Sequence, residues 1–334
     1  MFISLKPSLR RALMLAGLLA LAARSAKAET VDAMLDSLQA TSFQYFWNEA
    51  NPSNGLIKDR DTPGSLCSIA AVGFGLSAIC IGADHGWVTR SAAQARVRTT
   101  LETFWTGPQG TAASGTIGYK GFFYHFLDMT TGMRAGGSEL STIDTALLLA
   151  GVLDTKMYFS TADTEEVAIR ALADSIYRRV DWEWSRNSTL GIMMGWQPTS
   201  GFSGFGTWVG YNEASIMYIL ALGSPTHPIG AYAWNTWVSG YSWQTQYGQT
   251  YIIFPPLFGH QYSQCWLDLR HANDNVNRQR GITYFENSRR ATLAQRAYAI
   301  ANPGHFTAYS DTLWGLTASD VPTAPGDSRA IAQS

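Results

Sequence analysis

Apolar residues recur at three- and four-residue spacing along most of this chain, which predicts a mainly helical protein. Two of the predicted helices, 68–81 and 140–159, are apolar on nearly every face, whereas 90–105 and 164–180 have one apolar and one polar face. Such an alternation indicates inner and outer helix layers, as in a helical toroid, rather than a flat bundle. The predicted helices span residues 31–47, 68–81, 90–105, 140–159, 164–180, 213–222 and 287–300.

Long connectors rich in glycine and aromatic residues separate these helices. Loops of this length inside a compact domain usually carry function. Two of them contain short runs typical of strands, at 121–126 and 250–254. Because no stretch of proline, serine or charge divides the chain, we expect one domain over residues 29–320. The longest connectors span residues 51–63, 107–137, 182–210 and 241–259.

Both ends of the chain differ from its middle. A positively charged start, an apolar run over 12–23 and the small-residue site Ala26-Lys27-Ala28 predict a signal peptide over residues 1–28. The run is too short to anchor the mature protein in a bilayer. We therefore expect export to the periplasm or the medium. Residues 321–334 hold two prolines and few apolar side chains, which predicts a disordered or aberrant tail.

Composition narrows the ligand. The formal net charge is -1, and 15% of the residues are charged while 13% are aromatic. This balance gives no electrostatic reason to expect nucleic acid or an anionic membrane surface, and it suits a neutral polar ligand. The six histidines are scattered and the cysteines are unpaired in spacing, so we expect no metal and no cofactor. We expect a monomer in which Cys67, Cys80 and Cys265 serve packing.

Glu213 is the strongest candidate for chemistry. It lies in the segment GYNEA at 210–214, between an aromatic-rich loop and an apolar helix. A carboxyl in such surroundings is partly desolvated, which raises its pKa and lets it hold a proton near neutral pH. Sugar-cleaving sites combine such an acid with aromatic rings. The residues alone leave a second interpretation open, in which Glu213 only complements the helix dipole and the rings are core.

Other chemistries find little support. The sequence has no G-x-S-x-G elbow and no H-E-x-x-H motif. Asp144 falls one turn inside an otherwise apolar helix, where a charge needs either a partner such as Arg134 or a function. Glu286 belongs to a polar group that we interpret as bracing a site. That group comprises Asp268, Arg270, Glu286, Arg289 and Arg290.

Eleven segments, in order and spread over nearly all of the mature chain, resemble the bacterial glycoamylase-like family of glycoside hydrolases. This family includes endo-β-1,2-glucanases and a domain of cyclic β-1,2-glucan synthases. The segments are SFQYFW at 42–47, NGL at 54–56 with Asp59-Arg60, SIAAVGFGL at 68–76, GFFYHF at 121–126, ELSTIDTALL at 139–148, GW at 195–196, GYNEA at 210–214, LGSPTHP at 222–228, FGHQYS at 258–263, YFENS at 284–288 and WGLTA at 314–318.

The resemblance implies an all-α fold, an (α/α)6 toroid with long aromatic loops and short hairpins over the cleft. It implies that Glu213 is the general acid of an inverting reaction, in which a second, unassigned carboxylate activates a water molecule on the opposite face of the sugar. The two carboxyl groups of such a site lie about 6.5–9.5 Å apart, which leaves room for that water. Members of the family continue beyond the WGLTA segment, so we expect this chain to be truncated and its barrel incomplete. The substrate-binding residues that we expect are Asp144, Glu139, Asp128, Tyr211, Trp196, Trp208, His260, Gln261, Glu286 and Arg60.

The favoured function is therefore an exported, inverting glycoside hydrolase acting on a neutral glucan, with β-1,2-glucan as the favoured substrate. Two alternatives stay open. One is a carbohydrate-binding protein that kept the aromatic cleft but lost turnover. The other is a glucoamylase-type exo-enzyme that cleaves α-glucan, and a glycosyl transferase is a lesser variant.

Overall fold

The computed structural model describes residues 30–318. The chain divides between Ser42 and Phe43 into two compact units, and the described part of the first holds the start of helix α2 (Val31–Asn48). The predicted signal peptide and the predicted tail at 321–334 lie outside the described residues. Among the described helices, each is too short or too polar to cross a membrane.

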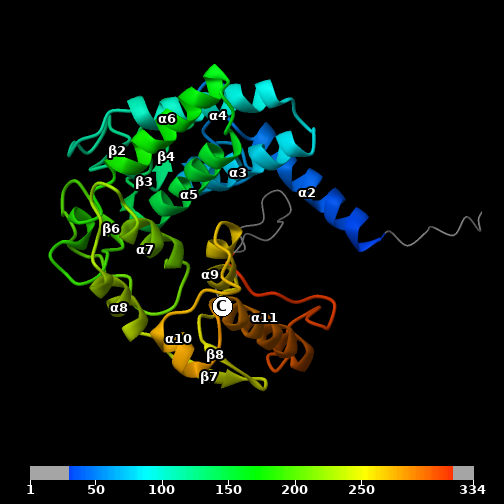
Figure 1. Cartoon of the computed structure of the whole chain (residues 1–334). Helices are drawn as coiled ribbons and strands as arrows, with labels where there is room; N and C mark the ends of the chain where they lie inside the picture. The colour runs from blue at the N-terminus through cyan, green and yellow to red at the C-terminus, as the bar shows by residue number, and fades with distance from the viewer. Residues whose placement is uncertain (1–29, 319–334) are drawn as a thin grey trace, which may run out of the picture. The chain divides into compact units, whose positions relative to one another are not determined.

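The second unit is dominated by helices (Figure 1). All of the predicted helices are present, with shifted ends. The last one begins at Tyr284 rather than 287, because the Thr283 hydroxyl accepts a hydrogen bond of 3.1 Å from the backbone N–H of Glu286. Short helices mixed with aromatic and polar residues were not predicted, notably α8 (Ala231–Ser239) and α10 (Asn275–Arg280). The helices are α3 (Ile69–Asp84), α4 (Arg90–Thr106), α5 (Thr142–Tyr158), α6 (Thr164–Arg179), α7 (Ser215–Leu222), α8 (Ala231–Ser239), α9 (Phe258–Gln261), α10 (Asn275–Arg280) and α11 (Tyr284–Ala301), with 3-10 turns η1 (Trp184–Arg186) and η2 (Tyr262–Cys265).

Helix α5 is the centre of the packing. It contacts α3 and α7, which are also apolar on most faces, and the amphipathic α6 packs on both α5 and α4 (Figure 1). The predicted layering of apolar and amphipathic helices is therefore present in this unit. Helices α3 and α5 meet backbone to backbone, because a Cβ on Gly73 would stand 2.2 Å from the carbonyl oxygen of Leu147.

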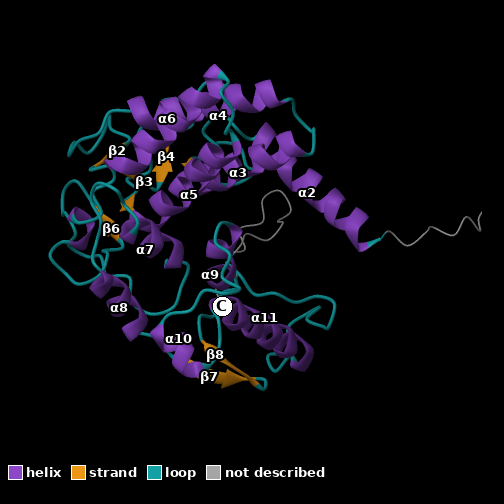
Figure 2. Ribbon diagram, viewed as in Figure 1, coloured by secondary structure: helices purple, strands orange, loops and turns teal. Residues whose placement is uncertain are grey.

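The strands are short segments among long loops (Figure 2). They form a four-stranded antiparallel sheet in the order β2-β3-β5-β6 and two separate pairs, β1-β4 and β7-β8. The single strand predicted at 121–126 is divided in two at His125, because its first half pairs with β5 and its second half with β1. The strands are β1 (Cys67–Ser68), β2 (Gly118–Tyr119), β3 (Phe122–Tyr124), β4 (Phe126–Leu127), β5 (Leu140–Ser141), β6 (Gly195–Trp196), β7 (Trp243–Gln246) and β8 (Gln249–Ile252).

Two of these strands run directly into inner helices. Strand β1 leads into α3 and β5 leads into α5, and in each case a serine caps the helix: Ser68 Oγ accepts from Ala71 N–H and Ser141 Oγ from Asp144 N–H. The pairing of β1 with β4 and of β5 with β3 holds both helix starts beside His125. This junction gathers polar side chains at one end of the apolar helices.

The cysteines divide in their environment. Cys67 and Cys80 are buried, and burial raises the pKa of both thiols, as expected for packing residues. Cys265 is exposed, so the prediction that it serves packing is wrong; the short turn η2 leaves it at the surface.

Candidate active site

A cavity of about 550 Å³ lies at the strand–helix junctions. Its wall combines four acidic residues and a histidine with aromatic rings, which is a composition suited to an uncharged ligand with many hydroxyls. The lining residues are Asp59, Ser68, Ala70, His125, Glu139, Ser141, Ile143, Asp144, Leu147, Met194, Phe205, Trp208, Glu213, Phe258, Tyr262 and Ala318, with Glu213 as the fourth acid of the wall.

Glu213 enters the cavity from the turn before α7. Its carbonyl oxygen accepts a hydrogen bond of 2.9 Å from Ser263 Oγ, and the Asn212 side chain accepts from Ala214 N–H at 3.0 Å, so the backbone is held on both sides. Its carboxyl oxygen Oε2 is buried and has no hydrogen-bond partner among residues 30–318. Burial raises the pKa of Glu213 to about 7, and the negative charge of Asp144 adds to the effect.

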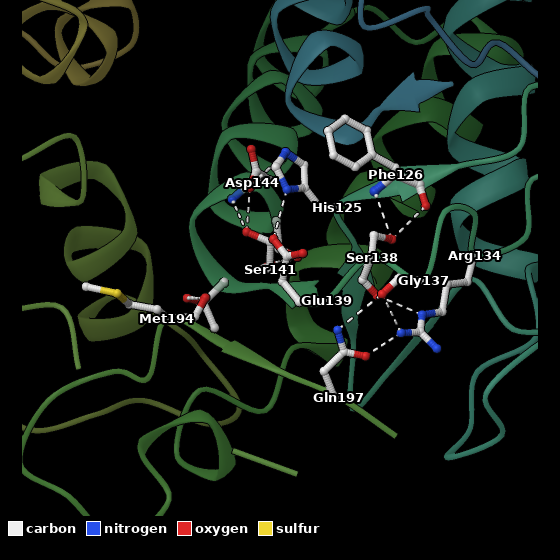
Figure 3. Close-up of polar contacts among 12 residues, drawn as sticks. His125, Phe126, Arg134, Gly137, Ser138, Glu139, Ser141, Asp144, Met194 and Gln197 are labelled. Atoms are coloured by element: carbon white, nitrogen blue, oxygen red, sulfur yellow. Dashed lines mark hydrogen bonds and ion pairs between the residues drawn. The ribbon is translucent and has the colours of Figure 1, made fainter. Parts of the chain in front are cut away.

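Asp144 reaches the cavity from the first turn of α5 and Glu139 from the residue before β5, with His125 between them (Figure 3). His125 Nδ1 lies 2.9 Å from Glu139 Oε1, and Nε2 lies 3.6 Å from Asp144 Oδ2. Ser141 Oγ donates to the same Asp144 oxygen at 2.5 Å. Arg134, which the sequence suggested as a partner for Asp144, donates instead to backbone carbonyls, including Ser138 O at 2.7 Å.

The three charged groups shift one another's protonation. Burial alone would lower the pKa of His125, but the Glu139 hydrogen bond and the charges of Asp144, Glu139 and Asp59 outweigh it and raise the pKa. Burial would raise the pKa of Glu139, yet the bond from His125 holds it below its usual value. Burial raises the pKa of Asp144 against the opposing charge of His125 and the Ser141 hydroxyl. Together these shifts favour a charged His125.

Aromatic rings supply the rest of the wall. Trp208 lines the cavity, and its indole Nε1 donates to Thr142 Oγ1 at 3.1 Å. Tyr262 lines it as well and packs against Phe258, with ring centroids 5.2 Å apart. Flat apolar faces beside carboxyl groups match the alternating C–H and hydroxyl surfaces of a pyranose ring.

Several of the expected substrate-binding residues lie away from the cavity wall. Asp128 Oδ1 accepts from Thr130 N–H and from both the N–H and the hydroxyl of Thr131, which holds a turn and keeps the pKa of Asp128 low. Glu286 pairs with Arg289 and Arg290 along the first turns of α11. Neither carboxylate is among the lining residues.

The aromatic candidates Tyr211, His260 and Trp196 are buried in the core. Tyr211 stacks on His260 at 4.8 Å, and burial lowers the pKa of His260 to about 4. Trp196 packs against Tyr119 and Trp184. None of the three is among the lining residues.

Gln261 and Arg60 complete the expected set. Gln261 is an exposed residue at the end of α9 and is not among the lining residues. Arg60 forms an ion pair of 2.7 Å with Asp59, which does line the cavity. The structure thus brings together Glu213, Asp144, Glu139 and Trp208 from the predicted set, and their roles stay predictions.

Among the lining residues that were not selected from the sequence are His125, Ser141 and Asp59. All three lie within segments singled out above, GFFYHF, ELSTIDTALL and the Asp59-Arg60 pair. From the sequence alone, a histidine flanked by aromatic residues is interpreted as a core residue, because its polar partners are not yet known. For Ser141 a signal was present: its S-x-x-D spacing to Asp144 marks a capped helix start.

Comparison with known proteins places the chain in a family. The Glycoamylase family model matches residues 206–330. A solved structure of a candidate glucoamylase from Bacteroides caccae superposes with a TM-score of 0.76 at 30% sequence identity, covering 87% of this chain and 73% of that one. The chain belongs to the glycoamylase-like family.

Two further relatives of this glycoamylase-like chain carry more specific names. The endo-β-1,2-glucanase of Chitinophaga pinensis, solved with sophorotriose and glucose, has a TM-score of 0.76 at 27% identity and covers 87% of this chain and 72% of its own. The exo-β-1,2-glucooligosaccharide sophorohydrolase of Parabacteroides distasonis is 26% identical over 330 residues, covering 87% of this chain. The chain spans 43% of the length of that curated relative.

Proposed function

We propose that this protein is a glycoside hydrolase that cleaves β-1,2-glucan, with Glu213 as the general acid. The observation that carries the proposal is the Glu213 carboxyl, which is buried, lacks a partner at Oε2 among residues 30–318, has a pKa raised to about 7 and opens onto a cavity with aromatic walls. A carboxylic acid that keeps its proton near pH 7 suits protonation of a leaving glycosidic oxygen. The names of the relatives support β-1,2-glucan as the substrate.

We propose an inverting reaction. The Glu213 proton passes to the leaving oxygen as the bond from that oxygen to the anomeric carbon breaks. A water molecule attacks the same carbon from the opposite face and gives its proton to a second carboxylate. Several carboxyl groups share the cavity with Glu213, which supplies the pair that such a reaction needs.

We further propose a fold, a location and an oligomeric state for the whole protein. An (α/α)6 toroid is supported by the contacts of apolar α5 with apolar α3 and α7, and by the packing of amphipathic α6 on α5 and α4. Export to the periplasm or the medium is supported by the sequence of residues 1–28. We propose a monomer that acts on a soluble glucan.

An α-glucan-cleaving exo-enzyme is the second candidate, because several structural relatives, among them that from Bacteroides caccae, carry the glucoamylase name. The test is release of reducing ends from linear β-1,2-glucan and from starch by the purified chain, with Glu213→Gln as the inactive control. Release from β-1,2-glucan alone, lost in the variant, supports the proposal. Release from starch alone overturns the assignment of β-1,2-glucan as the substrate. Sugar-dependent quenching of tryptophan fluorescence without any product indicates a carbohydrate-binding protein. The anomeric form of the first product, followed by NMR, separates inversion from retention.

A further inference from the structure

His125 is held in place by more than its ring. Its backbone N–H donates to Glu139 O at 2.9 Å, and its carbonyl accepts from Ile69 N–H at 3.2 Å, so it is fixed to the segments that lead into both α5 and α3. The imidazole stacks on Phe126 with centroids 4.0 Å apart and an interplanar angle of 13°. The direction of both ring nitrogens is therefore set by the fold (Figure 3).

Both ring nitrogens face acids. Nδ1 points to Glu139 and Nε2 to Asp144, and the charge of Asp59 acts from the opposite loop. A neutral imidazole donates from only one nitrogen, whereas the protonated ring donates from both. This arrangement, with carboxylates at both nitrogens and a third acid nearby, favours the imidazolium form.

The geometry also selects one oxygen of Asp144. Ser141 Oγ and His125 Nε2 both approach Oδ2, whereas Oδ1 has no hydrogen-bond partner among residues 30–318. The Asp144 side chain is 14% exposed and lines the same cavity as Glu213. Oδ1 is thus the oxygen available to a water molecule or a sugar hydroxyl.

We propose that His125 is a positioning residue whose positive charge keeps Asp144 ionised, so that Asp144 acts as the general base opposite Glu213. The inference rests on the proposed function. In the reaction, Asp144 Oδ1 takes a proton of the attacking water as the water oxygen bonds to the anomeric carbon. The bond from that carbon to the leaving glycosidic oxygen breaks, and Glu213 gives its proton to that oxygen. Burial pushes both acids toward the neutral form, and among residues 30–318 a cation opposes that effect at Asp144 but not at Glu213.

The test compares His125→Gln, which removes the charge, with His227→Gln, which removes another histidine that faces a carboxylate, 3.9 Å from Asp181 and outside the cavity. For His125→Gln we expect kcat on β-1,2-glucan to fall about 10²-fold with little change in KM. The acidic limb of the pH profile should move upward by about one pH unit, because Asp144 loses its neighbouring cation. His227→Gln should leave both unchanged. A merely structural role for His125 would lower stability without moving the acidic limb, and that result overturns the proposal.

Two further measurements keep the proposal open to refutation. The double variant His125→Gln, Asp144→Asn should be no less active than Asp144→Asn alone, because His125 acts through Asp144. Additive losses would contradict this.

If the wild-type chain is inactive on every glucan, the proposed function fails. The electrostatic coupling of His125 to Glu139 and Asp144 is then tested by NMR titration of the His125 imidazole in the wild type, Glu139→Gln and Asp144→Asn. A raised His125 pKa that falls in both variants supports the coupling. An unshifted His125 pKa overturns it. The same titration decides the case if His125→Gln does not fold.

Discussion

Trp208 is tied to the first residue of α5: its indole N–H donates to the hydroxyl of Thr142 at 3.1 Å. Thr142 is fully buried and its hydroxyl donates in turn to Met193 O at 2.8 Å. The aromatic wall and the helix that carries Asp144 are therefore parts of one hydrogen-bonded unit. A ring placed this rigidly offers a sugar a prepared surface, and little conformational entropy is lost on binding.

Truncating Trp208 should weaken substrate binding. For Trp208→Ala we expect KM for β-1,2-glucan to rise about tenfold, which corresponds to ~1.4 kcal/mol of lost contact. Trp208→Phe keeps the ring and should lose less. Trp196→Ala is the matched control, since Trp196 packs in the core outside the cavity. It should lower the melting temperature and leave KM unchanged; equal KM effects at both sites would contradict the assignment of Trp208 to the wall.

Replacing the proposed acid should abolish most of the activity. We expect Glu213→Gln to reduce kcat on β-1,2-glucan by about 10²–10⁴-fold, because a glutamine of the same shape has no proton to give. The measurement is initial-rate release of reducing ends by samples matched in circular dichroism. Glu286→Gln serves as control, because Glu286 is paired with arginines on α11 away from the cavity. Full activity in Glu213→Gln would rule out its role as the acid.

The pH profile should carry the signature of Glu213. Burial raises its pKa to about 7, and the acid works only when protonated, so kcat/KM should fall as the pH rises through about 7. Above that midpoint the decline approaches tenfold per pH unit. The residual activity of Glu213→Gln should lack this alkaline limb. Finding the limb unchanged in the variant would assign it to another group.

The raised pKa of Glu213 should also make the free energy of unfolding depend on pH. The pKa is about 7 in the folded chain and 4.5 as the ordinary value, so the folded state binds the extra proton between these values. The destabilisation by this residue is therefore largest above pH 7 and disappears below about pH 4.5. We expect Glu213→Gln to raise the free energy of unfolding at pH 8 by up to about 3 kcal/mol and to have little effect near pH 4.5.

Glu286→Gln gives a comparison of opposite sign. The side-chain bond from Arg289 holds the pKa of Glu286 down to about 2, so its stabilising contribution is present above pH 4.5 and is lost as the pH falls through about 2. This variant should be slightly destabilised at pH 8, by less than the shift suggests because the pair is solvent-exposed. Denaturant unfolding at pH 8 and near pH 4.5 measures the free energy of unfolding of both variants. If both variants were more stable than the wild type at pH 8, the opposite pKa shifts of Glu213 and Glu286 would be refuted.

The contact between α3 and α5 should tolerate no added methyl group. A Cβ on Gly73 would lie 2.2 Å from Leu147 O, and one on Gly151 would lie 2.0 Å from Gly73 O. We expect Gly73→Ala to lower the free energy of unfolding by about 3 kcal/mol, because backbone cannot move aside as a side chain can. At Gly110 the nearest atom to an added Cβ is 3.8 Å away, so Gly110→Ala should be neutral or stabilising. Chemical denaturation compares the two.

The long helices were predictable because their apolar residues recur within the helix itself. The spacing in α5 and α6 is complete within each segment, and local caps such as Asp163 at α6 set the start. Short elements depend on partners. The strand predicted at 121–126 is divided at His125 because β5 and β1, distant in sequence, compete for its two halves.

In the candidate site too, only features with a signal local in the sequence could be predicted. Glu213 stood out because the aromatic residues that bury it are close in sequence. Tyr211, only two residues away, was expected beside it on the same grounds, but it turns into the core onto His260 and Trp237. Sequence proximity to an acid does not say on which side of the chain a ring lies.

The sequence by itself determined the helical layers, the family resemblance and the residue with the strongest case for holding a proton, since these depend on patterns contained in single segments. Only the tertiary structure decided which carboxylates share a cavity with Glu213 and which serve turns or surface pairs. It alone placed His125 between Glu139 and Asp144. Charges act over a few ångströms of space, and the separation of residues along the chain does not fix that distance.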